Sequence, residues 1–342
     1  MIPDEVALTG YRGFESRQVI ALRPLTLLYG RNNAGKSALL RALPLLSDSI
    51  VNAGTDVLAV SSPAARGGGF RDISFDGRPE GFAVEWWWAA ARRRVIIELK
   101  LFPDWGRTVI GRFSVLEDAK GDGSEVRPLL TATWTPRREE RESPRLSYDI
   151  DPAGRASFNA PIAFRGHIPQ LDGDLAALPE IALAATLLRG LGGEVQWIEA
   201  ARRRPERALP EPLGPRWRLD PSGSDAVVAM RSIASVERAV SAWFERRAQR
   251  RVVTSDAGPG TFFTAVEAVA GDRRPHSIAD LGEGMIQVLP VLTAMELARR
   301  HRDGGAAILA VEEPESNLHP AFNPSSRRTF VSSPRRPSPR VS

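Results

Sequence analysis

The sequence predicts an α/β fold, and three observations support this prediction. An apolar strand, a glycine-rich loop and a helix follow one another within residues 18–46. A continuous apolar run, "AAILAV", ends in the two acids Glu312 and Glu313. Between these segments lie runs with the two-residue period of strands and runs with the 3.6-residue period of helices. A strand that leads through a loop into a helix is the first unit of an α/β domain.

The elements can be assigned in chain order from these two periods. Residues 4–29 alternate apolar and polar side chains in two runs, which predicts two strands, the second entering a buried sheet. Helical spacing follows over 36–46. The remaining expected elements are a strand meander at 82–88, 94–102 and 111–118, weak strands at 128–134 and 145–151, a helix at 174–191, a strand at 194–200, and helices at 235–249 and 285–301, the last kinked or started by Pro290.

The composition fits a cytoplasmic protein with one large domain or two modest ones. Its 342 residues are 42% hydrophobic and contain no long apolar run. The sequence has no cysteine, which excludes disulfides and thiolate metal sites, and its four histidines are scattered. The first ten residues lack the basic and apolar regions of a signal peptide. We therefore expect a cytoplasmic location and no membrane partner.

The formal net charge of +5 arises in the C-terminal tail. Residues 321–342 hold five arginines and no acid, so the other 320 residues carry 41 basic and 41 acidic side chains. The net charge is therefore no indication of nucleic-acid binding by the folded part. The low-complexity Ser/Pro/Arg composition of 321–342 predicts a disordered tail.

The segment "GRNNAGKS" at 30–37 matches the phosphate-loop pattern G-x-x-x-x-G-K-[ST]. It lies after an apolar strand and opens a helix, so its backbone N–H groups and the helix N-terminus can face phosphate oxygens. Lys36 is expected to reach the β- and γ-phosphates of ATP, and the Ser37 hydroxyl to ligate Mg²⁺. The alternative interpretation is a chance glycine-rich turn. The predicted ATP-binding residues of the loop are Gly30, Asn32, Asn33, Ala34, Gly35, Lys36 and Ser37.

The acidic end of the last apolar strand predicts the hydrolytic groups. Glu312 would hold Mg²⁺, and Glu313 would polarise the attacking water. Successive strand residues point to opposite faces, so the two acids cannot do the same work. Pro314 then ends the strand. The alternative interpretation is an ordinary solvated strand end.

Several segments together resemble one family of ATPases. The stretch from "LTGYRGF" to "GKSALLRAL" is similar to the N-terminus of RecF/SMC/Rad50-like ATPases, and more closely to AAA-type ATPases with ABC-like heads, which include the OLD-like ATPase domains. The segments "EVQWIEAARRRPER", "LDPSGSDAVVAM", "IADLGEGMIQVLPVL" and "LAVEEPESNLHP" extend the resemblance in the expected order. It covers 4–115 and 176–320. It implies an ABC-ATPase-like P-loop NTPase head with a mixed β-sheet, a helical signature lobe and a β-rich insertion.

The resemblance also implies roles for individual residues. Arg12, with Tyr11 or Phe14, would flank the nucleotide. The signature segment, Leu281 to Gln287, would meet the γ-phosphate of a partner's ATP in a head-to-head homodimer. The glycines Gly282 and Gly284 would serve there through their backbone N–H groups, because the usual signature serine is replaced by Gly282. The loop at 316–320 would touch the dimer partner.

The sequence departs from the family pattern after Pro320. The family continues there with an amphipathic helix, another strand and a switch histidine, and 321–342 contains none of these. We interpret the chain as C-terminally truncated, with a tail that another reading frame of the gene would explain.

Four parts are therefore expected. Residues 1–115 form the first part of the head with the phosphate loop. Residues 116–175 form an inserted or peripheral subdomain. Residues 176–320 form the helical lobe with the signature segment and the acidic strand, and 321–342 form the disordered tail.

Three functional hypotheses follow. The first is a Mg²⁺-dependent ATPase that acts as a dimer in DNA repair or phage defence, with DNA or the product of a neighbouring gene as partner. The second is a nucleotide-dependent interaction module with little turnover, and the third is an inactive product of a broken gene. Arg202–Arg204 could contact phosphate or a partner, whereas the run Trp86–Trp88 is interpreted as a hairpin with one inner tryptophan rather than a base-stacking surface.

Overall fold

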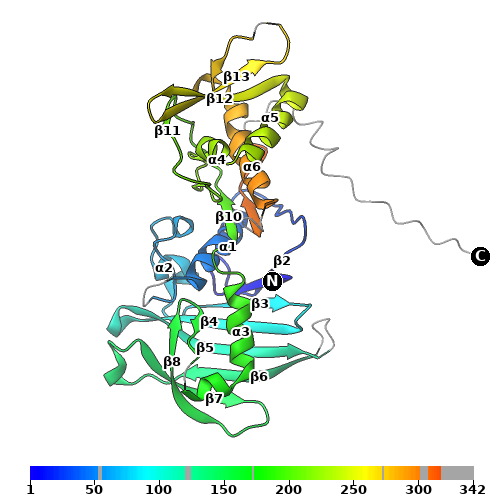
Figure 1. Ribbon diagram of the computed structural model, residues 1–342. Helices are drawn as coiled ribbons and strands as arrows, with labels where there is room; N and C mark the ends of the chain where they lie inside the picture. The colour runs from blue at the N-terminus through cyan, green and yellow to red at the C-terminus, as the bar shows by residue number, and fades with distance from the viewer. Residues whose placement is uncertain (53–55, 120–124, 172, 272, 301–306, 317–342) are drawn as a thin grey trace, which may run out of the picture. The chain divides into compact units, whose positions relative to one another are not determined.

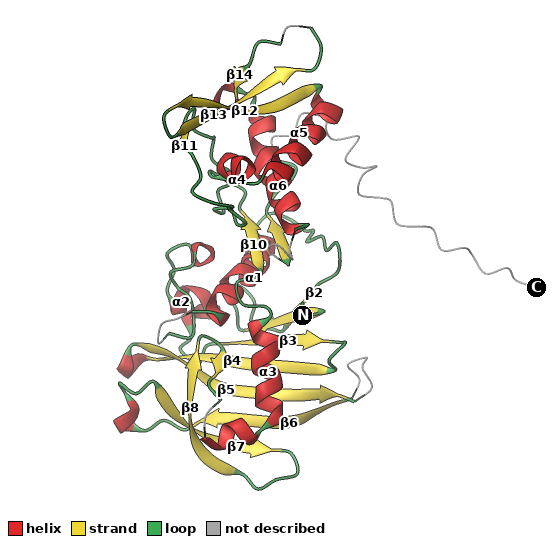
Figure 2. Ribbon diagram, in the orientation of Figure 1, coloured by secondary structure: helices red, strands yellow, loops and turns green. Residues whose placement is uncertain are grey.

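The computed structural model describes residues 1–52, 56–119, 125–171, 173–271, 273–300 and 307–316 (Figure 1). The chain divides into two compact units, Met1–Val195 and Gln196–Ser342, called unit 1 and unit 2 below. The mixed α/β class predicted from the sequence is confirmed, because both units contain helices and strands (Figure 2). The predicted tail at 321–342 lies outside the described residues.

Unit 1 is built on a nine-stranded sheet in the order β2-β1-β3-β4-β5-β6-β7-β8-β9. The strands are β1 (Glu5–Thr9), β2 (Gln18–Ala21), β3 (Phe82–Trp88), β4 (Arg93–Phe102), β5 (Arg107–Asp118), β6 (Val126–Trp134), β7 (Arg145–Pro152), β8 (Phe158–Arg165) and β9 (Ile168–Pro169). All eight neighbouring pairs are antiparallel. The expectation of a mixed sheet was therefore wrong for these strands. Consecutive strands from β3 to β9 form antiparallel pairs, and β1 lies antiparallel to both β2 and β3.

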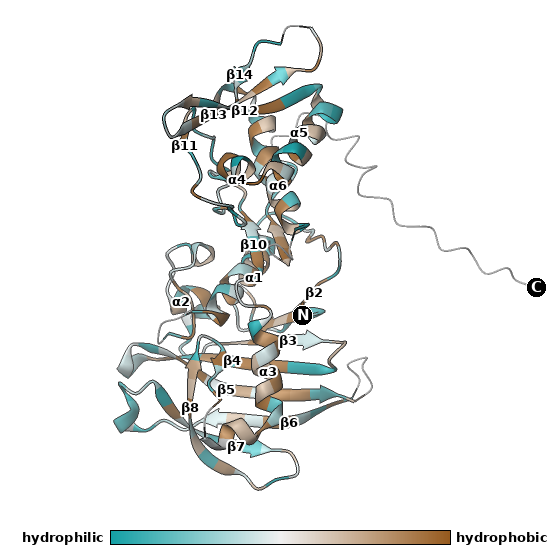
Figure 3. Cartoon of the chain, in the orientation of Figure 1, coloured by the Kyte–Doolittle hydropathy of each residue, from teal (hydrophilic) through white to brown (hydrophobic). Residues whose placement is uncertain are grey.

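Strand β5 continues across residue 115, and β6 to β9 extend the same sheet. Residues 116–175 thus supply consecutive strands to the meander that begins at β3. Brown and teal residues follow one another along these strands in Figure 3, as the two-residue period requires.

The tryptophans of β3 illustrate this period. Trp86 and Trp88 are buried on one face of the sheet, whereas the ring of Trp87 faces the other side, with the Arg94 guanidinium 5.1 Å from its centre. The expectation of a single inner tryptophan was wrong, because residues two apart share a face. The packing and the cation–π contact account for all three rings as structural groups.

Helices α1 (Lys36–Ile50), α2 (Phe70–Ile73) and α3 (Pro179–Arg189) complete unit 1. Helix α3 packs against β5 and β6 and lies along one face of the sheet (Figure 1). The last turn of α1 packs against the β8–β9 turn at Gly166. A Cβ atom there would lie 2.2 Å from the Ser49 carbonyl oxygen, and φ is +57°, so only glycine fits without strain.

Unit 2 contains helices α4 (Ala226–Ser232), α5 (Ala234–Ala248) and α6 (Glu283–Ala298). They share an apolar core with a small sheet in the order β11 (Leu209–Pro210), β13 (Thr261–Ala268), β12 (Arg250–Gly258), to which β14 (His276–Ser277) adds at β13. A separate pair joins β10 (Val195–Ile198) to β15 (Ile308–Val311). Pro290 lies inside α6 and does not start it.

The fold predicts an acid-sensitive unit 1 through His167. This side chain is fully buried in the β8–β9 turn, and burial lowers its pKa to about 4 from the ordinary 6.5. The unfolded chain therefore binds more protons than the folded one between pH 6.5 and 4. The stabilising contribution of neutral His167 is present above pH 6.5 and is lost as pH falls to 4. The loss is about 3 kcal/mol.

Urea denaturation at several pH values between 7 and 4 measures this loss. His167→Leu should flatten the pH dependence of the free energy of unfolding. His276→Gln, a change at an exposed histidine, should leave the dependence as in the parent protein. An equal slope in the parent and His167→Leu would show that other groups cause the acid sensitivity.

Candidate functional site

The phosphate loop has the backbone that its sequence predicts. Helix α1 begins at Lys36, and the preceding Gly35 is left-handed with φ of +84°. Asn33 is also left-handed, with φ of +66°. Lys36 Nζ donates to the carbonyl oxygens of Gly30 and Arg31, both at 2.8 Å. The Lys36 side chain therefore reaches back to the first residues of the loop. Ser37 follows in the first turn of α1.

The N-terminus of α1 suits an anion. Its first turn contains no acidic residue, and no side chain caps it. The first N–H groups of a helix have no partner within the helix, and the helix dipole favours negative charge there. Asn32, Asn33 and Ala34 are exposed, so the loop is open to a ligand. The donor set is what a polyphosphate such as ATP requires.

A tight turn from the first strand contacts the loop. Tyr11 and Phe14 exchange backbone hydrogen bonds of 2.9 Å, and the Phe14 ring lies against Gly35. A Cβ atom on Gly35 would be 2.3 Å from Phe14 Cζ, which explains why this position is glycine. Arg12, at the tip of the turn with φ of +47°, donates from Nε to the Tyr11 hydroxyl at 3.4 Å.

Arg41 is a residue of this region that the sequence interpretation missed. Its Nε donates to the Ser37 carbonyl oxygen at 2.9 Å. Burial raises the pKa of Tyr11, and the positive charges of Arg12 and Arg41 oppose that shift, so both guanidinium groups lie near the phenol. The signal in the sequence was an arginine one helical turn after Ser37.

The expected strand before the phosphate loop ends early. Strand β2 stops at Ala21, and residues 22–29 form no strand. Pro24 has no N–H to donate to a ladder. The Thr26 hydroxyl accepts from Arg23 N at 3.1 Å and donates to Ala21 O at 2.8 Å, which diverts backbone groups from a strand. Leu27 is 76% exposed, so the prediction of a buried strand was wrong for this segment.

The acidic strand end lies in unit 2. Glu312 follows β15 directly and is buried, whereas Glu313 is exposed. Their side chains differ in environment, as the strand period predicts. Glu313 is left-handed, with φ of +43°, and its Oε2 accepts from the Ser316 hydroxyl at 2.7 Å. Glu312 N donates to Ile198 O of β10 at 2.9 Å.

A buried arginine contacts this strand end. Arg202 is 6% exposed, and its Nη2 donates to the carbonyl oxygens of Glu312 and Glu313, the latter at 3.1 Å. Its Nη1 lies 3.4 Å from the Gln287 carbonyl oxygen and 3.5 Å from Gln287 Oε1. Burial lowers the pKa of Arg202, and the charges of Glu313, Glu315 and Glu312 oppose that shift.

The signature segment forms the start of α6. Gly282 is the N-cap, and nothing lies within 4 Å of a Cβ atom placed on it. Gly284 is the second residue of the helix. Arg204 holds this end through the carbonyl oxygens of Ala279 and Leu281, at 2.8 and 3.2 Å, and through Glu283 Oε2 at 2.8 Å. Arg202 and Arg204 thus contact protein groups on both sides of the segment.

The chain around Arg202 is held by the turn at 219–225. Arg203 N donates to Ser222 O at 2.8 Å, and Asp220 Oδ1 accepts from Ser222 N at 2.9 Å. Gly223, with φ of +68°, packs on Pro290 of α6, where a Cβ atom would lie 2.3 Å from Pro290 Cβ. This turn therefore contacts both the segment that carries Arg202 and helix α6.

The structure therefore brings the predicted residues together in two groups. Unit 1 contains the phosphate-loop residues and Arg12. Unit 2 contains the two glutamates Glu312 and Glu313, the two glycines Gly282 and Gly284, and the segment Arg202–Arg204. The predicted partner loop after Ser316, including His319, lies outside the described residues. In the part of the chain that the structure describes, no three His, Asp or Glu side chains form a metal-binding group.

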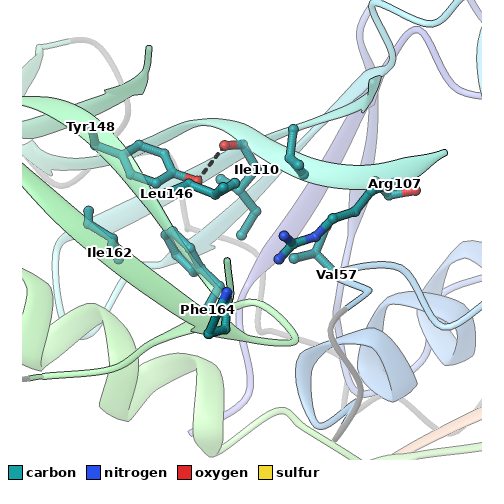
Figure 4. Close-up of a pocket in the computed structure, with 10 residues that line it drawn as sticks. Val57, Arg107, Ile110, Leu146, Tyr148, Ile162 and Phe164 are labelled. Carbon is teal, nitrogen blue, oxygen red and sulfur yellow. Dashed lines mark hydrogen bonds between the residues drawn. The ribbon is translucent and has the colours of Figure 1, made fainter. Parts of the chain in front are cut away.

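A small cavity in unit 1 contains none of the predicted site residues. It lies among β5, β7 and β8 and is lined largely by apolar side chains (Figure 4). Tyr148 and Ile110 both line it, and the Tyr148 hydroxyl donates to Ile110 O at 2.7 Å. Burial raises the pKa of Tyr148. These contacts indicate a packing defect rather than a reaction site.

A family model matches residues 126–332, and its description reads "AAA domain, putative AbiEii toxin, Type IV TA system". The match spans more than half of the chain. The chain belongs to this AAA domain family. The matched range includes the signature segment and the acidic strand end, and residues 30–37 precede it. No curated protein matches the chain. Among the described helices, none is long and apolar enough to cross a membrane.

The turn at 219–225 predicts a stability effect. Gly223→Ala should destabilise unit 2 by about 1–3 kcal/mol, because the added methyl group meets Pro290 and the positive φ strains any L-residue. Thermal unfolding of the full chain measures the loss. Gly214→Ala is the matched control, since a Cβ atom there meets nothing within 4 Å. Equal melting temperatures for the two variants would contradict the assigned contact.

Proposed function

We propose that this AAA domain binds ATP and hydrolyses it with Mg²⁺. The observation that carries the proposal is the phosphate loop: Lys36 Nζ donates to two loop carbonyl oxygens, beside the uncapped N-terminus of α1. A phosphate can replace those carbonyls as acceptor with a gain in charge complementarity. Family membership supports the same chemistry.

The roles of the chain's residues follow from their chemistry. Lys36 and the loop N–H groups would bind the phosphates, with Arg12 beside the nucleotide. Ser37 and Glu312 supply oxygen atoms of the kind that Mg²⁺ takes as ligands. When bound, Mg²⁺ neutralises charge on the phosphates. Glu313, which is exposed and oriented by Ser316, would accept a proton from the attacking water.

The family description supports a role in a toxin–antitoxin system. We propose phage defence as the setting and an antitoxin protein from a neighbouring gene as partner. DNA repair and direct DNA binding rest on the resemblance to RecF/SMC/Rad50-like heads alone. A second copy of the chain is proposed to meet the nucleotide through Gly282 and Gly284.

A nucleotide-dependent interaction module with little turnover is the second candidate. Gly282 favours it, because the signature position has no hydroxyl group to contact a phosphate. A multiple-turnover phosphate-release assay on the full chain separates the two functions: the ATPase releases many phosphates per chain, and the interaction module binds ATP without release.

Lys36→Ala should weaken ATP binding by about 100-fold, since it removes two charge-assisted hydrogen bonds of about 1.5 kcal/mol each. Titration with a fluorescent ATP analogue measures the dissociation constant. Lys100→Ala removes a lysine of β4 and should bind as the parent does. Unchanged binding by Lys36→Ala would refute the assignment of the loop.

Glu313→Gln should lower kcat by about 100-fold or more and leave the dissociation constant of ATP unchanged, because the amide cannot accept the proton of water. Phosphate release and analogue binding are measured in parallel. Glu315→Gln changes an exposed neighbouring acid and should keep the parent kcat. A Glu313→Gln protein with full turnover would remove Glu313 from its role.

A further inference from the structure

We infer that Arg202 is a positioning residue that couples the start of α6 to the backbone of the acidic strand end. The inference rests on the proposed function for its catalytic consequence, because it assigns an effect on the turnover that Glu313 supports. Its structural part stands on hydrogen bonds within unit 2 alone.

The guanidinium joins two segments that are distant in the sequence. One edge, Nη2, holds the successive carbonyl oxygens of Glu312 and Glu313. The other edge, Nη1, faces the backbone and side-chain oxygens of Gln287 in α6. A planar guanidinium has donors in fixed directions relative to one another. A shift of α6 that moves Nη1 therefore also moves Nη2, which donates to the carbonyl groups of the strand end.

The hydrogen bonds continue from Gln287 to the first turn of α6. Gln287 Nε2 donates to Glu283 Oε1 at 2.9 Å, and Glu283 Oε2 accepts from Arg204 at 2.8 Å. Arg204 also holds the carbonyl oxygens of Ala279 and Leu281, which flank the N-cap. A continuous path of hydrogen bonds therefore links the signature segment to the carbonyl group of Glu313.

The conformation of Glu313 depends on that carbonyl contact. A left-handed φ of +43° is unfavourable for a glutamate and persists only where its surroundings hold it. Arg202 Nη2 and Ser316 N both donate to the Glu313 carbonyl oxygen, each at 3.1 Å. Of these two donors, only Arg202 also touches α6. It thereby helps to hold the backbone from which the Glu313 side chain extends, while the Ser316 hydroxyl contacts the carboxylate.

The buried position limits what can replace Arg202. A lysine ammonium is a point charge without the fork of donors that reaches carbonyl groups of two segments. Methionine fills similar space and leaves the carbonyl groups of Gln287, Glu312 and Glu313 without this donor. Arg203 next to it is exposed and serves as a matched control for loss of one positive charge.

Four full-length variants test the inference: Arg202→Met, Arg202→Lys, Gln287→Met and Arg203→Met. Hydrogen exchange is followed for peptides covering 281–287 and 311–316, alongside kcat and ATP-analogue binding. Arg202→Met should raise exchange in both peptides by about tenfold or more and lower kcat by a similar factor, with the dissociation constant changed less than about threefold. Arg202→Lys should lie between it and the parent, and Arg203→Met should match the parent in the hydrogen exchange of both peptides.

Gln287→Met gives the readout that local damage at Arg202 cannot imitate. The contacts of Gln287 described above lie with α6 and Arg202, so faster exchange at 311–316 in this variant shows coupling through the guanidinium. Gln287→Met keeps the carbonyl contact with Arg202, so unchanged exchange at 311–316 in both Gln287→Met and Arg202→Met overturns the inference. An Arg202→Met protein with parental kcat overturns it as well. If Arg202→Met does not fold, Arg202→Lys and Gln287→Met carry the test.

The outcomes also separate the inference from the proposed function. A parent protein that binds ATP but releases no phosphate refutes the ATPase proposal. The exchange data then still decide the coupling, because they need no turnover.

Discussion

The burial of the Arg202 guanidinium is the constraint on which the arrangement of the acidic strand end and the start of α6 depends. A buried charge is costly unless hydrogen bonds replace its water. Here the acceptors come from the residues that follow β15 and from α6, and the chain that carries Arg202 is fixed by the turn at 219–225. Each of these segments must keep its place for the two Nη atoms of Arg202 to keep their acceptors. The arrangement of strand end and helix start is therefore specified by one side chain as well as by the apolar core.

The local parts of the site could be predicted from the sequence. The loop at 30–37 and the start of α1 follow from residues within eight positions, because left-handed glycine, lysine and helix N-terminus are close in the chain. Different environments for Glu312 and Glu313 were also predicted, although both lie beyond the end of β15 and Glu313 has a left-handed backbone. The role of Arg202 could not be predicted, because its acceptors lie 85 and 110 residues away. No local pattern separates it from the exposed Arg203.

The errors in the predicted fold also arise because strands depend on contacts with residues that are distant in the sequence. The run at 24–29 has the composition of a strand, but a strand also needs a neighbouring strand to pair with. Pro24 lacks an N–H group, and the Thr26 hydroxyl forms hydrogen bonds with backbone groups of Ala21 and Arg23 instead. The hairpin of β12 and β13 was not expected, although its residues alternate around Gly258 and Gly260. The arginine-rich sheet is not a basic surface, because Arg94 pairs with Glu85, and Arg93 and Arg127 pair with Glu117. Pairing of this kind depends on strand register, which the sequence alone leaves open.

The two cations of the proposed machinery are held in the same way and differ in burial. Lys36 and Arg202 both donate to backbone carbonyl oxygens, which satisfy N–H groups without neutralising the charge. Lys36 lies in an open loop, so water or a phosphate can take the place of its carbonyl partners at little cost. Arg202 is 6% exposed, so water has little access to its guanidinium and its protein acceptors are harder to replace. Hydrogen bonds to backbone carbonyl groups thus suit a ligand-binding role for the exposed Lys36 and a positioning role for the buried Arg202. The difference in solvent exposure decides between these roles.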